Sequence, residues 1–126
     1  MSQKVLLIDD EEGFTRLLKM NLEKSGKYQV MVENNSMRAH STARSFRPDV
    51  ILLDVVMPGL DGGDLLARFS DDPDLKHVPV IMLTALVSRG DTGPQAVAQS
   101  ANLNVLPKPV DLAMLTRVMD EALAQS

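Results

Sequence analysis

The amino-acid sequence predicts an α/β domain in which helices cover both faces of a five-stranded parallel sheet. Three short runs rich in β-branched and other apolar residues, at 5–8, 50–53 and 80–83, are continuous rather than alternating. Continuous runs of this length are typical of strands buried on both faces, as in a parallel sheet. Segments with helical periodicity separate the runs, and such alternation favours helices packed on both sides of one sheet.

Two weaker runs complete the predicted sheet. Residues 28–33 read Tyr-Gln-Val-Met-Val-Glu, and this partial alternation of apolar and polar side chains suits an edge strand. Residues 103–106 form a shorter and less apolar last strand. Because crossovers between parallel strands are right-handed, five strands joined by helices leave few topologies.

Each predicted helix has one apolar face. We expect the inward-facing residues to be Phe14, Leu17, Leu18 and Leu22; then Ala39, Ala43 and Phe46; then Leu65, Leu66 and Phe69; and finally Leu112, Leu115, Met119 and Leu123. Gly26 should end the first helix, and Asp111 should cap the last. The second helix should begin at Asn35 or Ser36. A fourth helix is expected to be short and to begin near Pro94.

Composition limits the classes of function. The 126 residues fit one domain, 1–126, and the absence of cysteine excludes disulfides and thiolate metal sites. A net charge of -4 and only one Tyr and three Phe argue against direct nucleic-acid binding. No apolar run has membrane-spanning length, and the N-terminus does not resemble a signal peptide. We therefore expect a cytoplasmic protein without a membrane partner.

Polar side chains follow four of the predicted strands at the points where those strands end. Asp9 and Asp10 follow the first strand, Asp54 the third, Thr84 the fourth and Lys108 the fifth. Each residue alone has an ordinary explanation, such as a helix N-terminus for the acids or a solvated charge for the lysine. Because parallel strands end at one edge of a sheet, the residues should converge there, and this joint placement favours a functional site.

The chemistry of such a cluster follows from its side chains. Clustered carboxylates need a cation, and oxygen ligands without His or Cys suit Mg²⁺. A carboxylate can attack phosphorus and form an aspartyl phosphate. The transferred group carries negative charge on its oxygens, which an ammonium, a hydroxyl and a metal ion stabilise.

The chain resembles the receiver domain of response regulators, the chemotaxis-regulator-like family of two-component signalling. The resemblance covers essentially the whole chain and lies in four segments that share the order and spacing of the family: Val-Leu-Leu-Ile-Asp-Asp-Glu at 5–11, Pro-Asp-Val-Ile-Leu-Leu-Asp-Val-Val-Met-Pro-Gly-Leu-Asp-Gly at 48–62, Val-Pro-Val-Ile-Met-Leu-Thr-Ala at 78–85 and Leu-Pro-Lys-Pro at 106–109. It implies a flavodoxin-like, doubly wound sheet with the strand order 2-1-3-4-5.

The resemblance also implies roles for the acidic residues. Asp54 is the phosphoacceptor of a two-component phosphorelay. Asp10 binds Mg²⁺ directly, Asp9 helps through water, and Asp54 and the backbone carbonyl of Val56 are further ligands. The donor is a phosphohistidine on a sensor histidine kinase or a histidine phosphotransfer protein.

Thr84 and Lys108 are implied to contact the phosphoryl group, and the Lys108-Pro109 bond is implied to be cis. Such a domain catalyses only its own phosphorylation and dephosphorylation and is not otherwise an enzyme. Its output is a changed affinity for a downstream protein or effector domain, and a phosphorylation-dependent dimer is one form of that output. Val105 departs from the family pattern, which has Tyr or Phe at this position, and this departure puts the standard output face in doubt.

Three alternatives belong to other classes. A hydrolase of the haloacid-dehalogenase-like kind needs a second acid two residues after the nucleophile, where this chain has Val56. A flavodoxin-like binder of small molecules needs a Gly-, Ser- or Thr-rich loop after the first strand, where this chain is acidic. A degenerate receiver would act as a phosphorylation-independent interaction module, against which the intact Asp10, Asp54, Thr84 and Lys108 argue.

Two apolar residues predict a long-lived aspartyl phosphate. Val56 and Leu86 lie two positions after Asp54 and Thr84, and neither can orient an attacking water by hydrogen bonding. His40 and His77 have no partner in the sequence and are expected to be surface residues.

Overall fold

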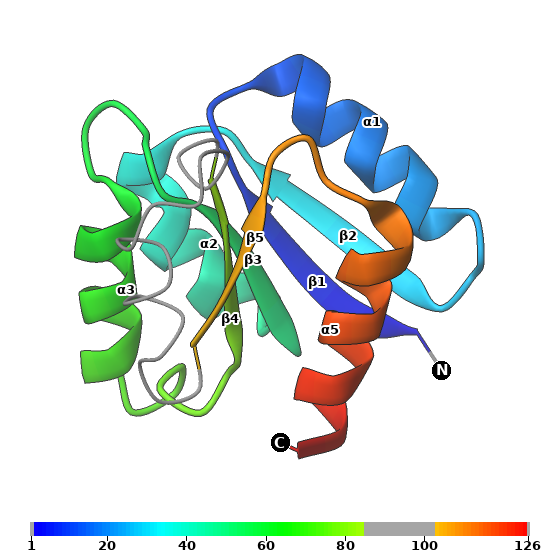
Figure 1. The fold of residues 1–126 in the computed structure, drawn as a ribbon. Helices are drawn as coiled ribbons and strands as arrows, with labels where there is room; N and C mark the ends of the chain where they lie inside the picture. Colours follow the sequence, from blue (N-terminus) through cyan, green and yellow to red (C-terminus); the bar gives the residue numbers. More distant parts are fainter. Residues whose placement is uncertain (1, 85–102, 126) are drawn as a thin grey trace.

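The computed structural model describes residues 2–84 and 103–125, and from these it builds a parallel five-stranded sheet (Figure 1). The strands are β1 (Gln3–Ile8), β2 (Tyr28–Glu33), β3 (Val50–Asp54), β4 (Val80–Thr84) and β5 (Leu103–Pro107). Their order in the sheet is β2-β1-β3-β4-β5 and every pairing is parallel, so the predicted fold class and strand order are confirmed. β2 lies at an edge, as its alternating sequence indicated.

Helices cover both faces of this sheet (Figure 1). α1 (Glu12–Glu23) and α5 (Leu112–Gln125) lie on one face, and α2 (Ala39–Phe46) and α3 (Gly62–Asp71) lie on the other. A short 3-10 turn, η1 (Ser36–Arg38), leads into α2. The predicted short helix near Pro94 lies outside the described residues. None of the described helices is long and apolar enough to cross a membrane.

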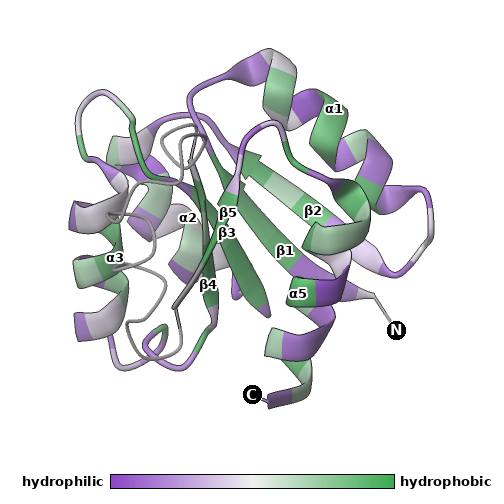
Figure 2. Cartoon of the chain, viewed as in Figure 1, coloured by the Kyte–Doolittle hydropathy of each residue, from purple (hydrophilic) through white to green (hydrophobic). Residues whose placement is uncertain are grey.

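The sheet divides the core into two halves, because successive side chains of each strand point to opposite faces. Leu18 and Leu22 of α1 and Leu115 of α5 pack in one half, against Val5 and Leu7 of β1 among others. The second half contains the α2 and α3 side chains Ala39, Ala43, Phe46, Leu65 and Phe69, which pack on Leu6 and Ile8. Figure 2 shows the strands as mainly hydrophobic and the helices as striped, as expected for amphipathic helices on a buried sheet.

Helix ends follow the predicted signals. Gly26 has a φ of 78°, in the left-handed region that a glycine adopts without strain. Asn35 caps η1 by accepting a hydrogen bond from the backbone N–H of Met37. The Asp111 carboxylate accepts hydrogen bonds from the N–H groups of Ala113 and Met114 at 3.0 and 3.3 Å, so the predicted cap of the last helix is confirmed.

Two of the predicted inward-facing residues are exposed. Leu17 in α1 and Leu112 at the start of α5 are large apolar side chains that face solvent, with exposed fractions of 58% and 38%. In α1 the apolar stripe predicted from helical periodicity is too wide. Leu17 is adjacent to Leu18, and only Leu18 points at the sheet. Leu66 and Leu123 are partly buried and pack at the margin of the core.

A second polar cluster joins α2 to the end of α3. The Asp72 carboxylate accepts a hydrogen bond from Arg44 Nη1 at 2.6 Å and lies 2.9 Å from His40 Nε2. Its other oxygen accepts from the N–H of Asp74 at 2.8 Å. The expectation that His40 has no partner is therefore wrong, because its partner is 32 residues away in the chain.

Candidate phosphoryl-acceptor site

The predicted site residues meet at one edge of the sheet. Asp9 follows β1, Asp54 ends β3, Thr84 ends β4 and Lys108 follows β5. The register aligns these strand ends, since Asp54 is opposite Leu83 and Thr84 is opposite Pro107. Because these four strands run parallel and end together, residues that are far apart in the sequence lie close together in space.

Three carboxylates form the acidic part of the site. Asp9, Asp10 and Asp54 each offer a carboxylate oxygen, and these oxygens all lie within 4.8 Å of one another. Asp9 is fully buried and Asp54 is 5% exposed, whereas Asp10 faces solvent. A group of oxygen ligands with an open side is suited to Mg²⁺, which binds one or two carboxylates and keeps several waters. The three residues therefore fit the metal that the sequence predicts.

Lys108 is the cation that faces these carboxylates. Its Nζ lies 2.6 Å from Asp9 Oδ2, 2.9 Å from Glu11 Oε1 and 3.6 Å from Asp54 Oδ1. The ammonium also lies 4.5 Å from the centre of the Phe14 ring, a cation–π contact. Burial favours the neutral amine, but the hydrogen bonds to Asp9 and Glu11 outweigh it and raise the pKa of Lys108. The lysine is therefore charged. The peptide bond that follows it, Lys108-Pro109, is cis, as predicted.

Asp54 lies in surroundings that resist its charge. Burial raises the pKa of Asp54 to about 6, and the Asp9 carboxylate adds to this rise while the Lys108 ammonium opposes it. The N–H of Val56 donates to Asp54 Oδ1 over a long 3.4 Å. The ionised carboxylate of Asp54 is therefore only weakly stabilised by hydrogen bonds and positive charge, and a bound cation would stabilise it further.

Thr84 and Val56 flank Asp54 in different ways. Thr84 is buried at the end of β4, and its backbone carbonyl accepts the N–H of Lys108 at 3.0 Å, which ties the lysine to the neighbouring strand. The Val56 side chain is 61% exposed. Leu86 lies outside the described residues, and so does the segment that follows Thr84.

Residues that were not among the predicted site residues support the acidic loop and Lys108. The Asn34 side-chain amide donates to the backbone carbonyl of Asp9 at 2.7 Å and to Thr15 Oγ1 at 3.1 Å. Glu11 and Phe14 contact Lys108 from α1 and its start. Glu11 belongs to the conspicuous acidic run, but nothing in the local sequence of Asn34 links it to residue 9.

Gly62 fixes the backbone beside Asp54. A Cβ atom at this position would lie 2.7 Å from the Asp54 carbonyl oxygen and 2.8 Å from Val55 Cα, closer than side chains are found. The preceding Asp61 forms a capping box with Asp64 that starts α3 at this point. The Asp-Gly pair after Leu60 therefore brings the start of α3 close to the end of β3.

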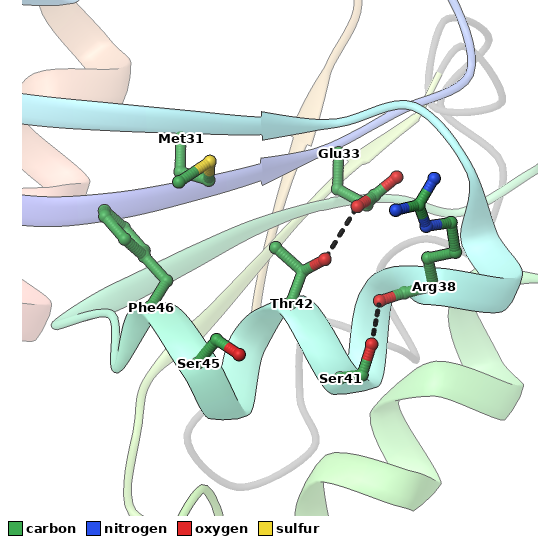
Figure 3. A pocket seen from close by; sticks show the side chains of 7 residues that line it. All are labelled: Met31, Glu33, Arg38, Ser41, Thr42, Ser45 and Phe46. Carbon is green, nitrogen blue, oxygen red and sulfur yellow. Dashed lines mark hydrogen bonds between the residues drawn. The ribbon is translucent and has the colours of Figure 1, made fainter.

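A separate pocket lies between β2 and α2 (Figure 3). Its volume is about 490 Å³, and Met31 and Phe46 form its apolar part. Arg38, Ser41, Thr42 and Ser45 supply polar groups from η1 and α2, and Thr42 donates a hydrogen bond to Glu33 at 2.7 Å. None of the predicted site residues lines this pocket.

Comparison with known proteins agrees with the fold. The model of the response regulator receiver domain family matches residues 5–120, and the chain belongs to this family. It is 31% identical over 112 residues to the polar-differentiation response regulator DivK of Brucella anthropi, which covers 89% of each chain. The crystal structure of the Vibrio cholerae chemotaxis protein CheY4 has a TM-score of 0.82 and 25% identity, covering 97% of this chain and 99% of that one.

A longer relative shows the same similarity over part of its length. The response regulator PleD of Caulobacter vibrioides is 40% identical over 115 residues, which are 91% of this chain. The matched region is 25% of PleD, so this chain spans about a quarter of that relative. The described fold is therefore that of a response-regulator receiver domain of two-component signalling.

Proposed function

We propose that Asp54 accepts a phosphoryl group from a phosphohistidine in a Mg²⁺-dependent reaction. The observation that carries this proposal is the meeting of Asp54, Lys108 and Thr84 with two further carboxylates at one sheet edge. The donor is a sensor histidine kinase or a histidine phosphotransfer protein. Phosphorylation then changes the affinity of the domain for a downstream protein.

The transfer is a displacement at phosphorus. An oxygen of Asp54 forms the new O–P bond, the P–N bond to the donor histidine breaks, and the departing imidazole takes up a proton. Because the pKa of Asp54 is about 6, its carboxylate is ionised at neutral pH and can act as the nucleophile. Lys108 Nζ lies 3.6 Å from Asp54 Oδ1, so the ammonium can also pair with the oxygens of a phosphoryl group bound to Asp54.

The metal has a defined set of ligands in this proposal. Asp10, Asp54 and the backbone carbonyl of Val56 bind Mg²⁺, and Asp9 contributes through water. When bound, Mg²⁺ supplies positive charge that offsets the repulsion between the carboxylates and the phosphoryl oxygens. Asp9 suits an indirect role because Lys108 and the N–H of Glu11 already engage its two oxygens, at 2.6 and 3.0 Å.

Residues 1–126 act as one receiver unit in the cytoplasm, and the unit catalyses only its own phosphorylation and dephosphorylation. The rival interpretation, a phosphorylation-independent interaction module, is not favoured. Such a module has no need of an acidic cluster with a lysine directed at it, and Asp10, Asp54, Thr84 and Lys108 are all present.

Intact-mass measurement after incubation with acetyl phosphate and Mg²⁺ tests the proposal. Wild-type protein should gain one phosphoryl group, and Asp54→Asn should gain none. Asp72→Asn is the matched control, because it removes another carboxylate of similar burial far from the site. Equal labelling of wild type and Asp54→Asn would contradict the assignment of the acceptor.

A further inference from the structure

The loop between β3 and α3, residues 55–61, follows Asp54 and carries the Val56 carbonyl. Its two ends are held by the backbone. The N–H of Val55 donates to the Leu83 carbonyl at 3.1 Å, and the N–H of Gly62 donates to the Val55 carbonyl at 2.9 Å. The position of the Val56 carbonyl therefore depends on what holds the middle of the loop.

One side chain from another part of the molecule holds that middle. Ser36 Oγ donates to the Pro58 carbonyl at 2.8 Å and accepts the Leu60 N–H at 3.0 Å. In the part of the chain that the structure describes, the backbone of residues 56–60 makes one further hydrogen bond, from the Val56 N–H to Asp54 at 3.4 Å. The two short hydrogen bonds of this segment both end on Ser36.

The residue between the two bonded groups is adapted to this contact. Gly59 has a φ of 85°, which a glycine adopts without strain. A Cβ atom at Gly59 would lie 2.9 Å from Ser36 Oγ. The missing side chain thus allows both the turn of the loop and the approach of the hydroxyl.

Ser36 itself is rigidly placed. It is 4% exposed and begins η1, where the Asn35 side chain accepts the Met37 N–H at 3.0 Å. The N–H of Asn35 in turn donates to the carboxylate of Glu33 at 3.0 Å, at the end of β2. The Ser36 hydroxyl is therefore held by η1 and the end of β2, which the hydrogen bonds of Asn35 join.

We propose that Ser36 is a positioning residue for the metal, acting through the loop that it tethers. This inference rests on the proposed function, in which the Val56 carbonyl is a ligand of Mg²⁺. Mg²⁺ demands near-ideal octahedral geometry with ligands at about 2.0–2.1 Å. A loop freed from Ser36 samples other positions, so the carbonyl is correctly placed in only a fraction of molecules and the apparent affinity for Mg²⁺ falls.

Titration calorimetry with MgCl₂ in the absence of a phosphodonor tests the inference. Ser36→Ala should raise the Kd for Mg²⁺ by about 3- to 10-fold, the effect of about one lost hydrogen bond and smaller than the loss of a ligand. Ser41→Ala is the matched control, because its hydroxyl donates only to the Arg38 carbonyl in the same region, and it should bind like wild type. Ser36→Thr keeps the hydroxyl and should restore most of the affinity.

A second readout separates positioning from loss of folded protein. Labelling by acetyl phosphate in Ser36→Ala should approach the wild-type level at saturating Mg²⁺, whereas a partly unfolded variant would stay below it at every concentration. If Ser36→Ala does not fold, Ser36→Cys serves instead, since its thiol fills the same space but hydrogen-bonds only weakly, and it should weaken Mg²⁺ binding in the same way. A wild-type Kd in the folded variant overturns the inference alone. A wild-type protein that neither binds Mg²⁺ nor is labelled overturns the proposed function as well.

Discussion

Asp54 at the end of β3 and Asp72 at the end of α3 are two carboxylates with almost no exposed surface, 5% and 6%. The Arg44 guanidinium, the N–H of Asp74 and the His40 ring all point at Asp72 and hold its pKa at about 2. Burial and the Asp9 carboxylate instead raise the pKa of Asp54 to about 6, against the Lys108 ammonium. The two pKa values shift in opposite directions because burial is the largest cause at Asp54, whereas at Asp72 the hydrogen bonds from Arg44 and the N–H of Asp74 outweigh burial.

The comparison indicates what each region is built to do. At Asp72 one carboxylate meets an arginine, a histidine and a backbone donor, so its charge is satisfied and joins α2 to the end of α3. At Asp54 a single lysine is shared among Asp9, Glu11 and Asp54. A charge that the protein leaves unsatisfied marks the place where a ligand cation or a reaction supplies the balance.

The largest expected effect concerns Mg²⁺ binding. Asp10→Asn should raise the Kd for Mg²⁺ by more than about tenfold, and Asp9→Asn should raise it less, because Asp9 is already bonded to Lys108. Asp72→Asn should leave the Kd unchanged. Calorimetric titration of the three variants measures this order, and a larger loss for Asp9→Asn would reverse our assignment of direct and indirect ligands.

The second prediction concerns the stability that Asp72 provides. Asp72→Asn weakens the contacts with Arg44 and His40 and should lower Tm by roughly 5–10 °C at neutral pH. Ser41 lies in α2 with His40 and Arg44 but is exposed and does not contact Asp72, so Ser41→Ala should change Tm little. Thermal unfolding followed by circular dichroism gives both values, and an unchanged Tm for Asp72→Asn would mean that this cluster does not stabilise the fold.

The pH dependence of this difference has a definite sign. A folded-state pKa below the ordinary value of 3.8 means that the stabilisation is fully present above that value. It is lost as pH falls toward the folded-state pKa of about 2. The Tm difference between wild type and Asp72→Asn should therefore shrink between about pH 4 and pH 2.

The third prediction has the opposite sign at Asp54. In metal-free buffer at pH 8, Asp54→Asn should stabilise the protein by about 1–2 kcal/mol, a value reduced for screening by solvent. Here the folded-state pKa lies above the ordinary one, so the ionised form is destabilising above about 6 and the gain should vanish as pH falls from about 6 to about 4. Urea unfolding across this range measures it. A destabilised Asp54→Asn would remove the contrast with Asp72.

The smallest expected effect concerns the lifetime of the phosphorylated state. Val56 lies two residues after Asp54, its side chain is exposed and apolar, and it cannot orient a water molecule by hydrogen bonding. Val56→Asn supplies such a group and should speed loss of the phosphoryl group by about 2- to 5-fold at constant Mg²⁺. Decay of the phosphorylated mass after removal of the donor measures the rate. Equal decay in both proteins would show that Val56 does not shield the site.

The fold was readable because its signals are local. The continuous apolar runs that became β1, β3 and β4 are buried on both faces, and the Asp111 cap acts within three residues. Helical faces were less certain: the period alone could not tell that Leu18 is buried and Leu17 is exposed. That choice depends on the orientation of α1 on the sheet, which residues far away in the chain determine.

The sequence by itself determined the strands, their parallel direction and the convergence of Asp9, Asp54, Thr84 and Lys108, because the carboxyl ends of parallel strands lie at one edge. The strand order was implied by the family resemblance. Only the tertiary structure decided which side chains meet across long separations. Lys108 reaches Asp9 across 99 residues, His40 reaches Asp72 across 32, and Ser36 reaches Pro58 across 22. Periodicity and capping describe a residue and its near neighbours, whereas these contacts depend on how whole elements are placed in three dimensions.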